Sequence, residues 1–236
     1  MRSDRGMSLL EATIVLSVAA VLAAMVAPAV RNYVQTAQQA TAKKDVETLG
    51  SALARFLADN GEAWFLQDGN GASATAAPAH STKVELMVSD GRTPAVNTAR
   101  GAGTDWDTAV NNTTVQKFEY FLVTNTPSNA AANAYRSATN MSLTAQFDPD
   151  GGAQFNSEYA WRGPYLPGPI GSDPWGNRYA ANVEFLARTL GTGPSGSDND
   201  VVVISAGDDG IIETKFNTDG YTSGNDVFYV FSGGTR

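Results

Sequence analysis

The sequence predicts an α+β protein in which one long N-terminal helix packs on a small antiparallel sheet. Three observations lead to this prediction. Residues 12–30 form an uncharged apolar run, residues 31–60 continue at helical spacing, and the last third of the chain carries short apolar runs separated by turn residues. The 236 residues therefore divide into a helical quarter and one folded domain.

The first segment, residues 7–30, has the length and composition of a membrane-spanning helix. It follows a polar leader, residues 1–6, and the 19 residues from Ala12 to Val30 carry no charge. At about 1.5 Å per residue they span roughly 28 Å, close to the roughly 30 Å of bilayer hydrocarbon. Because the leader carries two arginines, we expect it on the cytoplasmic side and the rest of the chain across the membrane.

Glu11 places a carboxylate at the start of this apolar run. Burying an ionised side chain in hydrocarbon costs at least about 2.5 to 3.5 kcal/mol, so an acid there needs a partner and is a functional candidate. The alternative is that Glu11 lies in the headgroup layer. Farther along, Pro28 predicts a kink, because proline removes a backbone donor and clashes with the preceding turn.

At these residues the chain resembles the prepilin family, which comprises the type IV pilins and the pseudopilins of type II secretion. Its members carry a short basic leader that ends in glycine, and a glutamate at the fifth mature position. The resemblance implies that a prepilin peptidase cuts between Gly6 and Met7 and methylates the new amine. It also implies that Glu11 pairs with the amine of a neighbouring subunit during filament assembly. Most members carry phenylalanine where this chain has Met7.

A second targeting signal remains open, because residues 27–29 (APA) have the form of the small-residue end of an ordinary secretory signal. Cleavage after Ala29 would leave a soluble secreted protein that starts at Val30. The long apolar run, the acid at its start and the helical pattern that continues after it favour the prepilin interpretation.

Residues 31–60 predict the amphipathic half of the same helix. One face is apolar and should pack on the domain, and the opposite face carries charges and should meet water. The apolar stripe consists of Val46, Leu49, Leu53, Phe56 and Leu57, and the charged face of Lys43, Lys44, Asp45, Glu47 and Arg55.

Residues 61–160 are rich in Ala, Asn, Thr, Ser and Gly, and carry two apolar islands. Residues 84–88 predict a strand, and residues 118–123 a strand or a short helix. The region after the long helix is variable in pilins and decorates the filament surface. The resemblance therefore implies that 61–160 is a variable insertion.

The C-terminal sheet region, residues 161–236, carries three ordered motifs: GPYL at 163–166, DPWGNRY at 173–179 and SAGDDG at 205–210. They resemble the corresponding motifs of the major pseudopilin of type II secretion. We expect Trp175 to fill the seam between helix and sheet, Tyr179, Ala181 and Val183 to share one face, and residues 208–210 to turn a hairpin. Residues 227–231 predict a late strand.

Major pseudopilins bind calcium in the loop before the last segment, and the matching place here is residues 219–226. Asn225 and Asp226 stand where the family carries paired aspartates, and Asp219 is a further candidate ligand. Calcium takes six to eight oxygen ligands, which such a loop can supply. The alternative is that these residues only make turns.

Composition argues against other classes of function. The chain has 24 acidic and 16 basic side chains, and an acidic surface does not favour binding to nucleic acid. The chain has one histidine and no cysteine, so the usual catalytic bases, nucleophiles and zinc ligands are scarce. We therefore expect that the protein is not an enzyme.

The prediction is therefore a structural subunit of a homo-oligomeric helical filament, in the periplasm or outside the cell. The resemblance implies a prepilin peptidase, an assembly ATPase and a membrane platform as partners. A type II secretion pseudopilin fits the C-terminal motifs. A type IV pilus pilin, which would serve adhesion, motility or DNA uptake, and a minor or tip subunit with a binding role remain alternatives.

Overall fold

The computed structural model describes seven parts of the chain, and the leader 1–6, Met7 and Asp219 lie outside them. The described parts are residues 8–60, 84–97, 106, 115–130, 161–183, 201–216 and 224–230. The chain divides into two compact units, residues 1–40 and 41–236.

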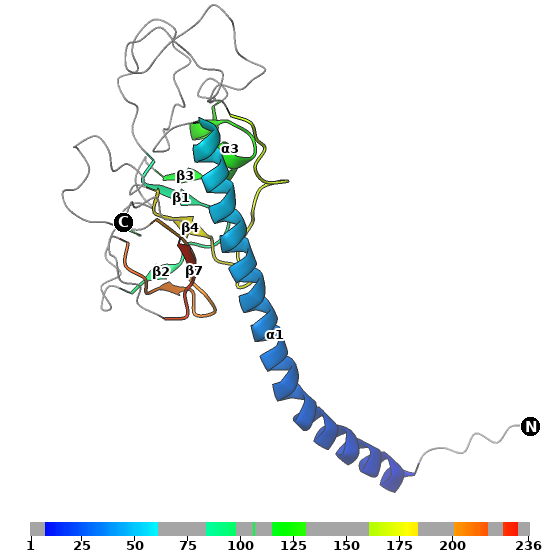
Figure 1. Ribbon diagram of the computed structural model, residues 1–236. Helices are drawn as coiled ribbons and strands as arrows, with labels where there is room; N and C mark the ends of the chain where they lie inside the picture. The colour runs from blue at the N-terminus through cyan, green and yellow to red at the C-terminus, as the bar shows by residue number, and fades with distance from the viewer. Residues whose placement is uncertain are drawn as a thin grey trace, which may run out of the picture. The chain divides into compact units, whose positions relative to one another are not determined.

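Helix α1 runs from Leu9 to Asn60, so the single long helix predicted for 7–60 is present in the described residues (Figure 1). Its residues are mostly Ala, Leu and Val, and the interior holds one proline, Pro28, and one glycine, Gly50. The helix continues through Pro28. Whether the helix kinks there stays a prediction.

The second unit contains a five-stranded sheet in the order β3-β1-β4-β5-β7. Three neighbouring pairs are antiparallel: β1 with β4, β4 with β5, and β5 with β7. The fourth pair, β1 with β3, is parallel. A second sheet of two parallel strands pairs β2 with β6. The elements are β1 (Leu86–Val88), β2 (Ala95–Val96), β3 (Val115–Lys117), α3 (Phe118–Leu122), η2 (Pro127–Asn129), β4 (Ala180–Ala181), β5 (Val202–Ser205), β6 (Ile211–Ile212) and β7 (Val227–Val230).

The fold class is therefore α+β with a long N-terminal helix on a mixed sheet, and the expectation of an antiparallel sheet was wrong. The strand at residues 84–88 and the late strand are confirmed, and the island at 118–123 forms the short helix α3. Each strand is only two to four residues long, so which strands pair, and in which direction, depends on contacts between distant parts of the chain.

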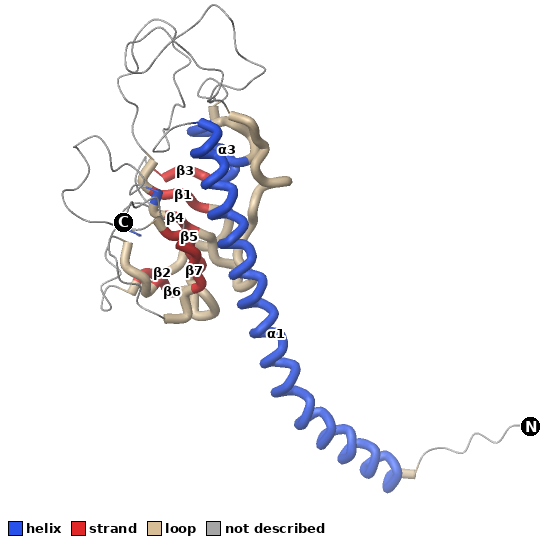
Figure 2. Tube along the Cα trace, viewed as in Figure 1, coloured by secondary structure: helices blue, strands red, loops and turns tan. Residues whose placement is uncertain are grey.

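The C-terminal turns of α1 lie along one face of the five-stranded sheet (Figure 2). The predicted stripe packs there. Val46, Leu49, Leu53 and Phe56 have no exposed surface, and Leu57 is half-buried. Full burial of each large apolar side chain stabilises the fold by roughly 1.5–3 kcal/mol.

Side chains alternate between the two faces of the sheet. Met87, Ala181 and Val203 join the cluster under α1, whereas their neighbours Leu86, Ala180 and Val202 join a second cluster on the opposite face. Tyr179, Ala181 and Val183 all lie in the first cluster, as predicted. The second cluster is built around Trp106, whose ring meets Phe216 edge-on with centroids 4.8 Å apart.

Two local expectations for the C-terminal region were wrong. Trp175 is only half-buried and belongs to neither core cluster, while Trp106 is 1% exposed. Residues 207–210 do form a turn, but the strands on either side do not pair with each other: β5 pairs with β4 and β7, and β6 pairs with β2. The turn therefore leads from one sheet to the other.

Part of the range expected to form an insertion belongs to the folded domain. Residues 84–97 and 115–130 supply β1, β2, β3 and α3. Met87, Phe118, Phe121 and Leu122 are fully buried in the cluster under α1. Whether residues 61–160 vary among relatives stays a prediction.

One residue of the predicted charged face is not fully in water. Asp45 is half-buried, and its Oδ2 accepts a hydrogen bond of 2.8 Å from the Tyr179 hydroxyl. Lys43, Lys44, Glu47 and Arg55 are exposed, as predicted.

Candidate functional site

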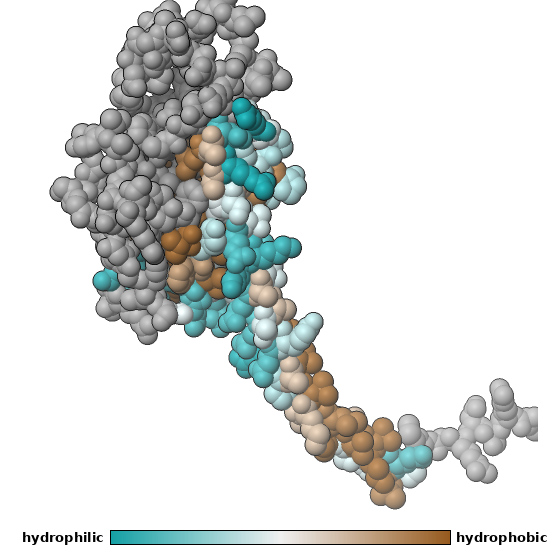
Figure 3. Space-filling view, in the orientation of Figure 1, coloured by the Kyte–Doolittle hydropathy of each residue, from teal (hydrophilic) through white to brown (hydrophobic). Residues whose placement is uncertain are grey.

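The N-terminal part of α1 presents apolar side chains on all sides. No described residue before Thr41 is buried, and Leu9, Leu16 and Met25 are 69–85% exposed. Figure 3 shows this apolar surface in brown along the first turns of the helix. The helix is long and apolar enough to cross a membrane. An apolar surface of this extent is typical of a segment that another hydrophobic phase covers.

The two hydroxyl groups at the start of the run are already satisfied within the helix. Thr13 Oγ1 donates to the carbonyl of Leu10 at 2.8 Å, and Ser17 Oγ donates to the carbonyl of Ile14 at the same distance. Such bonds remove the need for water or a partner, so these side chains cost little in an apolar environment.

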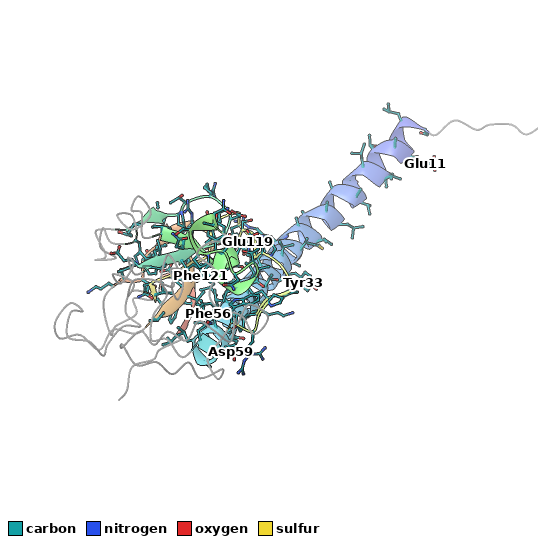
Figure 4. All side chains as sticks on the ribbon, turned by 90° about the horizontal axis from the view of Figure 1, so that it is seen from above. Glu11, Tyr33, Phe56, Asp59, Glu119 and Phe121 are labelled. Carbon is teal, nitrogen blue, oxygen red and sulfur yellow. The ribbon has the colours of Figure 1, made fainter. Side chains whose placement is uncertain are left out.

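Glu11 is the only acid of this segment, and it lies in the first turn of α1. Figure 4 labels Glu11 near the N-terminal end of the helix. The turn begins at Ser8, whose Oγ accepts a hydrogen bond from the Leu10 amide at 3.3 Å. A carboxylate in a first turn interacts favourably with the helix dipole. Among the described residues, Glu11 takes part in no salt bridge.

The C-terminal candidate site centres on Asp226, which immediately precedes β7. Its Oδ2 accepts three hydrogen bonds: 2.9 Å from the Glu213 amide, 2.7 Å from the Thr214 amide and 2.7 Å from Thr214 Oγ1. Its Oδ1 is buried and has no hydrogen-bond partner in the described part of the chain. Asp226 therefore fastens the start of β7 to the end of β6 and still has one oxygen unused.

Burial raises the pKa of the Asp226 carboxyl, because desolvation disfavours its charged form. The hydrogen bonds from Thr214 and Glu213 oppose this rise, and the negative charge of Glu213 adds to it.

Glu213 itself is 7% exposed and directly follows β6. Its Oε1 lies 3.5 Å from Asn97 Nδ2, at the limit of a hydrogen bond. Its carboxylate also lies against Gly224, where an added Cβ would sit 1.3 Å from Oε2. The described C-terminal residues thus hold the buried carboxylate of Glu213 and the half-buried carboxylate of Asp226 on neighbouring backbone segments.

The structure brings together only some of the residues that the sequence singled out. Asn225 is exposed, and Gly6, Met7 and Asp219 lie outside the described residues. Glu213 was missed, because its burial depends on the pairing of β6 with β2, and Asn97 is 116 residues away along the chain. The two isoleucines that precede Glu213 in the sequence do not indicate that its side chain is buried.

The described residues contain no group of three or more His, Cys, Asp or Glu side chains that could hold a metal ion. An ion at Asp226 would therefore need carbonyl, amide or water oxygens besides the two carboxylates, and calcium accepts such ligands.

No protein-family model, curated protein or solved structure matches this chain. The membrane-length helix and the C-terminal carboxylate pair are therefore the features on which a function can be argued.

Proposed function

We propose that this chain is a structural subunit of a type IV pilus-like filament, and that among such filaments it is closest to a type II secretion pseudopilin. One observation carries the proposal. Helix α1 of the folded domain begins with an apolar part of membrane length, residues 9–30, and this part has a single carboxylate, Glu11, in the first turn of the helix. Such a helix can first lie in a membrane and then in the core of a filament.

Glu11 would neutralise the N-terminal amine of a neighbouring subunit. This pairing would offset the roughly 2.5–3.5 kcal/mol cost of a charge in an apolar environment. The helix then associates through its exposed apolar surface, with Ile14, Val15, Val18 and Val21 packed against other copies; each is 54–58% exposed in the single chain.

The rest of the proposal follows from the resemblance of the N-terminal sequence to prepilins. A prepilin peptidase removes residues 1–6, cutting between Gly6 and Met7, and methylates the amine. The protein lies in the inner membrane with its domain in the periplasm, and an ATPase and a membrane platform assemble it. It acts without catalysis of its own and without specific nucleic-acid binding.

Calcium is the proposed ligand of the C-terminal domain. The unused, buried Oδ1 of Asp226 supports the proposal, because a buried anionic oxygen without a donor is costly unless a cation or proton compensates it. Asp226 would be a ligand, with Asp219 and Asn225 as the further candidates from the sequence.

The first test is the intact mass and N-terminal sequence of the protein isolated from its own cells. A start at Met7 with one added methyl group supports the prepilin pathway. A start at Val30 would mean an ordinary secretory signal, and the filament proposal would fall.

A second test addresses assembly directly. Glu11→Ala should leave processing intact and weaken filament formation, which chemical crosslinking of membranes and electron microscopy can measure. Glu47→Ala is the matched control, because Glu47 is an exposed glutamate of the same helix. Normal filaments from Glu11→Ala would refute the pairing.

A further inference from the structure

We propose that Arg31 and Tyr33 anchor α1 to the phosphate headgroups on the domain side of the bilayer, and that they fix how deep the helix lies in the membrane. The inference rests on the proposed membrane location of residues 9–30, and it adds the lipid contact at which this segment ends. Arg31 and Tyr33 directly follow the apolar run, whose last residue is Val30.

The charge pattern after the apolar run is the first reason. The charged side chains between Glu11 and Asp45 are all basic, namely Arg31, Lys43 and Lys44, although the whole chain has 24 acidic and only 16 basic side chains. Arg31 is exposed and takes part in no salt bridge among the described residues. A guanidinium binds phosphate through paired N–H donors. The chemistry of this position therefore fits the phosphate of a phospholipid.

Tyr33 supplies the amphipathic ring that is typical of a membrane–water interface. Its side chain is 78% exposed, and Figure 4 labels it on α1 together with Glu11. Consecutive residues of a helix point about 100° apart, so Arg31, Asn32 and Tyr33 point to three different sides. A single neighbouring helix covers one side only, whereas a headgroup layer surrounds the whole helix. The distribution of these side chains therefore favours lipid as the partner.

The spacing between the two ends of the segment agrees with this assignment. Arg31 lies 20 residues after Glu11, which corresponds to about 30 Å along a helix and equals the thickness of bilayer hydrocarbon. With Arg31 at one boundary, the Glu11 carboxylate reaches the headgroups at the opposite boundary. In the membrane-resident subunit Glu11 then stays hydrated, and its charge becomes buried only when the helix enters the filament.

The two lysines of the same helix lie too far from the bilayer to bind the same lipids. Lys43 follows Val30 by 13 residues, or about 20 Å. The headgroup layer adds about 5–8 Å to the hydrocarbon on each side, and the Debye length at physiological salt is about 8 Å. Lys43 lies beyond both distances, and like Arg31 it is exposed, so it serves as the matched control.

The test places one fluorescent label on the full chain in vesicles of phosphatidylcholine and phosphatidylglycerol, at a low ratio of protein to lipid. The chain has no cysteine, so one introduced cysteine gives a unique labelling site. Val34→Cys reports on the proposed boundary, whereas a label at Met25 should lie in lipid and one at Gln39 in water. Quenching by aqueous iodide measures how accessible each label is to water. We expect strong quenching at positions 34 and 39 and weak quenching at position 25.

In the Val34→Cys background, Arg31→Leu should draw the label into lipid and lower iodide quenching about twofold or more, because an apolar residue replaces the charge at the boundary. Tyr33→Leu should change the quenching in the same direction but less. Arg31→Lys keeps a cation that can reach the headgroups and should leave the quenching unchanged, as should Lys43→Leu.

Unchanged quenching in Arg31→Leu would overturn the anchor and leave the membrane location intact. Strong iodide quenching at position 25 would overturn the membrane location together with the anchor. An effect of Arg31→Leu that appears only at a high ratio of protein to lipid would overturn the lipid assignment, because Arg31 would then contact other copies of the chain.

Discussion

Gly50 lies in the C-terminal part of α1, and the ring of Tyr229 packs directly on it. A Cβ at this position would be 2.3 Å from Cδ1 of that ring and 2.5 Å from Cε1. The sequence alone indicates only that Gly50 lowers the helix propensity of α1 without ending the helix. In the structure its missing side chain lets the last strand approach the helix, so the glycine is required for packing.

Gly50→Ala should lower the free energy of unfolding. Alanine improves helix propensity by about 1 kcal/mol, but forcing a methyl group into a filled space costs about 1–3 kcal/mol. We expect a net loss of about 1 kcal/mol, measured by urea denaturation in detergent. Gly168→Ala is the control, because nothing lies within 4 Å of its Cβ position. A variant as stable as the parent would show that Tyr229 moves aside freely.

The hydroxyl of Tyr165 couples stability to alkaline pH. Burial raises its pKa to about 12 from the ordinary value of 10.0, although a hydrogen bond from the Arg162 amide opposes the rise. Since the folded state holds this proton more tightly than the unfolded state, the contribution is complete below pH 10 and is lost as the pH rises through about 12.

Tyr165→Phe should therefore reduce the fall in stability above pH 10, when denaturation midpoints are compared at several alkaline pH values. Tyr33→Phe, at a site 78% exposed, is the control for a general effect of removing a tyrosine. Identical alkaline profiles for the parent and Tyr165→Phe would contradict the prediction.

At the scale of elements, the turn at 173–179 is held by one buried carboxylate. Asp173 is 3% exposed, its Oδ1 accepts from the amides of Trp175 and Asn177, and its Oδ2 accepts from Ser205 Oγ at 2.7 Å. It therefore shapes the turn that leads into β4 and joins it to the end of β5.

Asp173→Ala should destabilise the domain by at least about 3 kcal/mol, because the Asn177 amide, the Ser205 hydroxyl and the Trp175 amide lose their acceptor at once. Asp173→Asn keeps an oxygen for the two amides and should cost much less. Thermal unfolding followed by far-ultraviolet circular dichroism would measure both. Equal losses for the two variants would mean that the charge matters more than the turn geometry.

The predictable elements are those whose pattern is local. The stripe from Val46 to Phe56 and the alternation of Tyr179, Ala181 and Val183 could be read from spacing alone, and both lie in the core as expected. The parallel pairs β1·β3 and β2·β6 could not, because strands of two or three residues carry no information about their partner. The same limit hid the buried carboxylate of Glu213 and the core role of Trp106.

At the scale of the whole molecule, the two units differ in what they contribute to stability. Every buried residue of α1 lies at Ala42 or beyond. A chain that begins at residue 31 should therefore stay soluble without detergent and unfold with nearly the stability of the full chain. A chain that begins at Leu49 should be much weaker, since it lacks Val46 and the Asp45–Tyr179 hydrogen bond. Circular dichroism and urea denaturation compare the two chains. Equal stability would mean that residues 31–48 are dispensable for the stability of the domain.

The position of β7 near the end of the chain also determines how long α1 stays uncovered during biosynthesis. Residues 49–57 of α1 leave the ribosome early, yet Tyr229, which packs over Gly50, belongs to a strand made about 170 residues later. At about 5–20 residues per second, the ribosome needs roughly 10–30 seconds to cover that distance. For that time the apolar stripe of the helix has no completed sheet to cover it. In the proposed membrane location, the first segment of the nascent chain would be anchored in a bilayer during this interval and held away from other nascent chains. Early insertion would then protect the domain as well as place it.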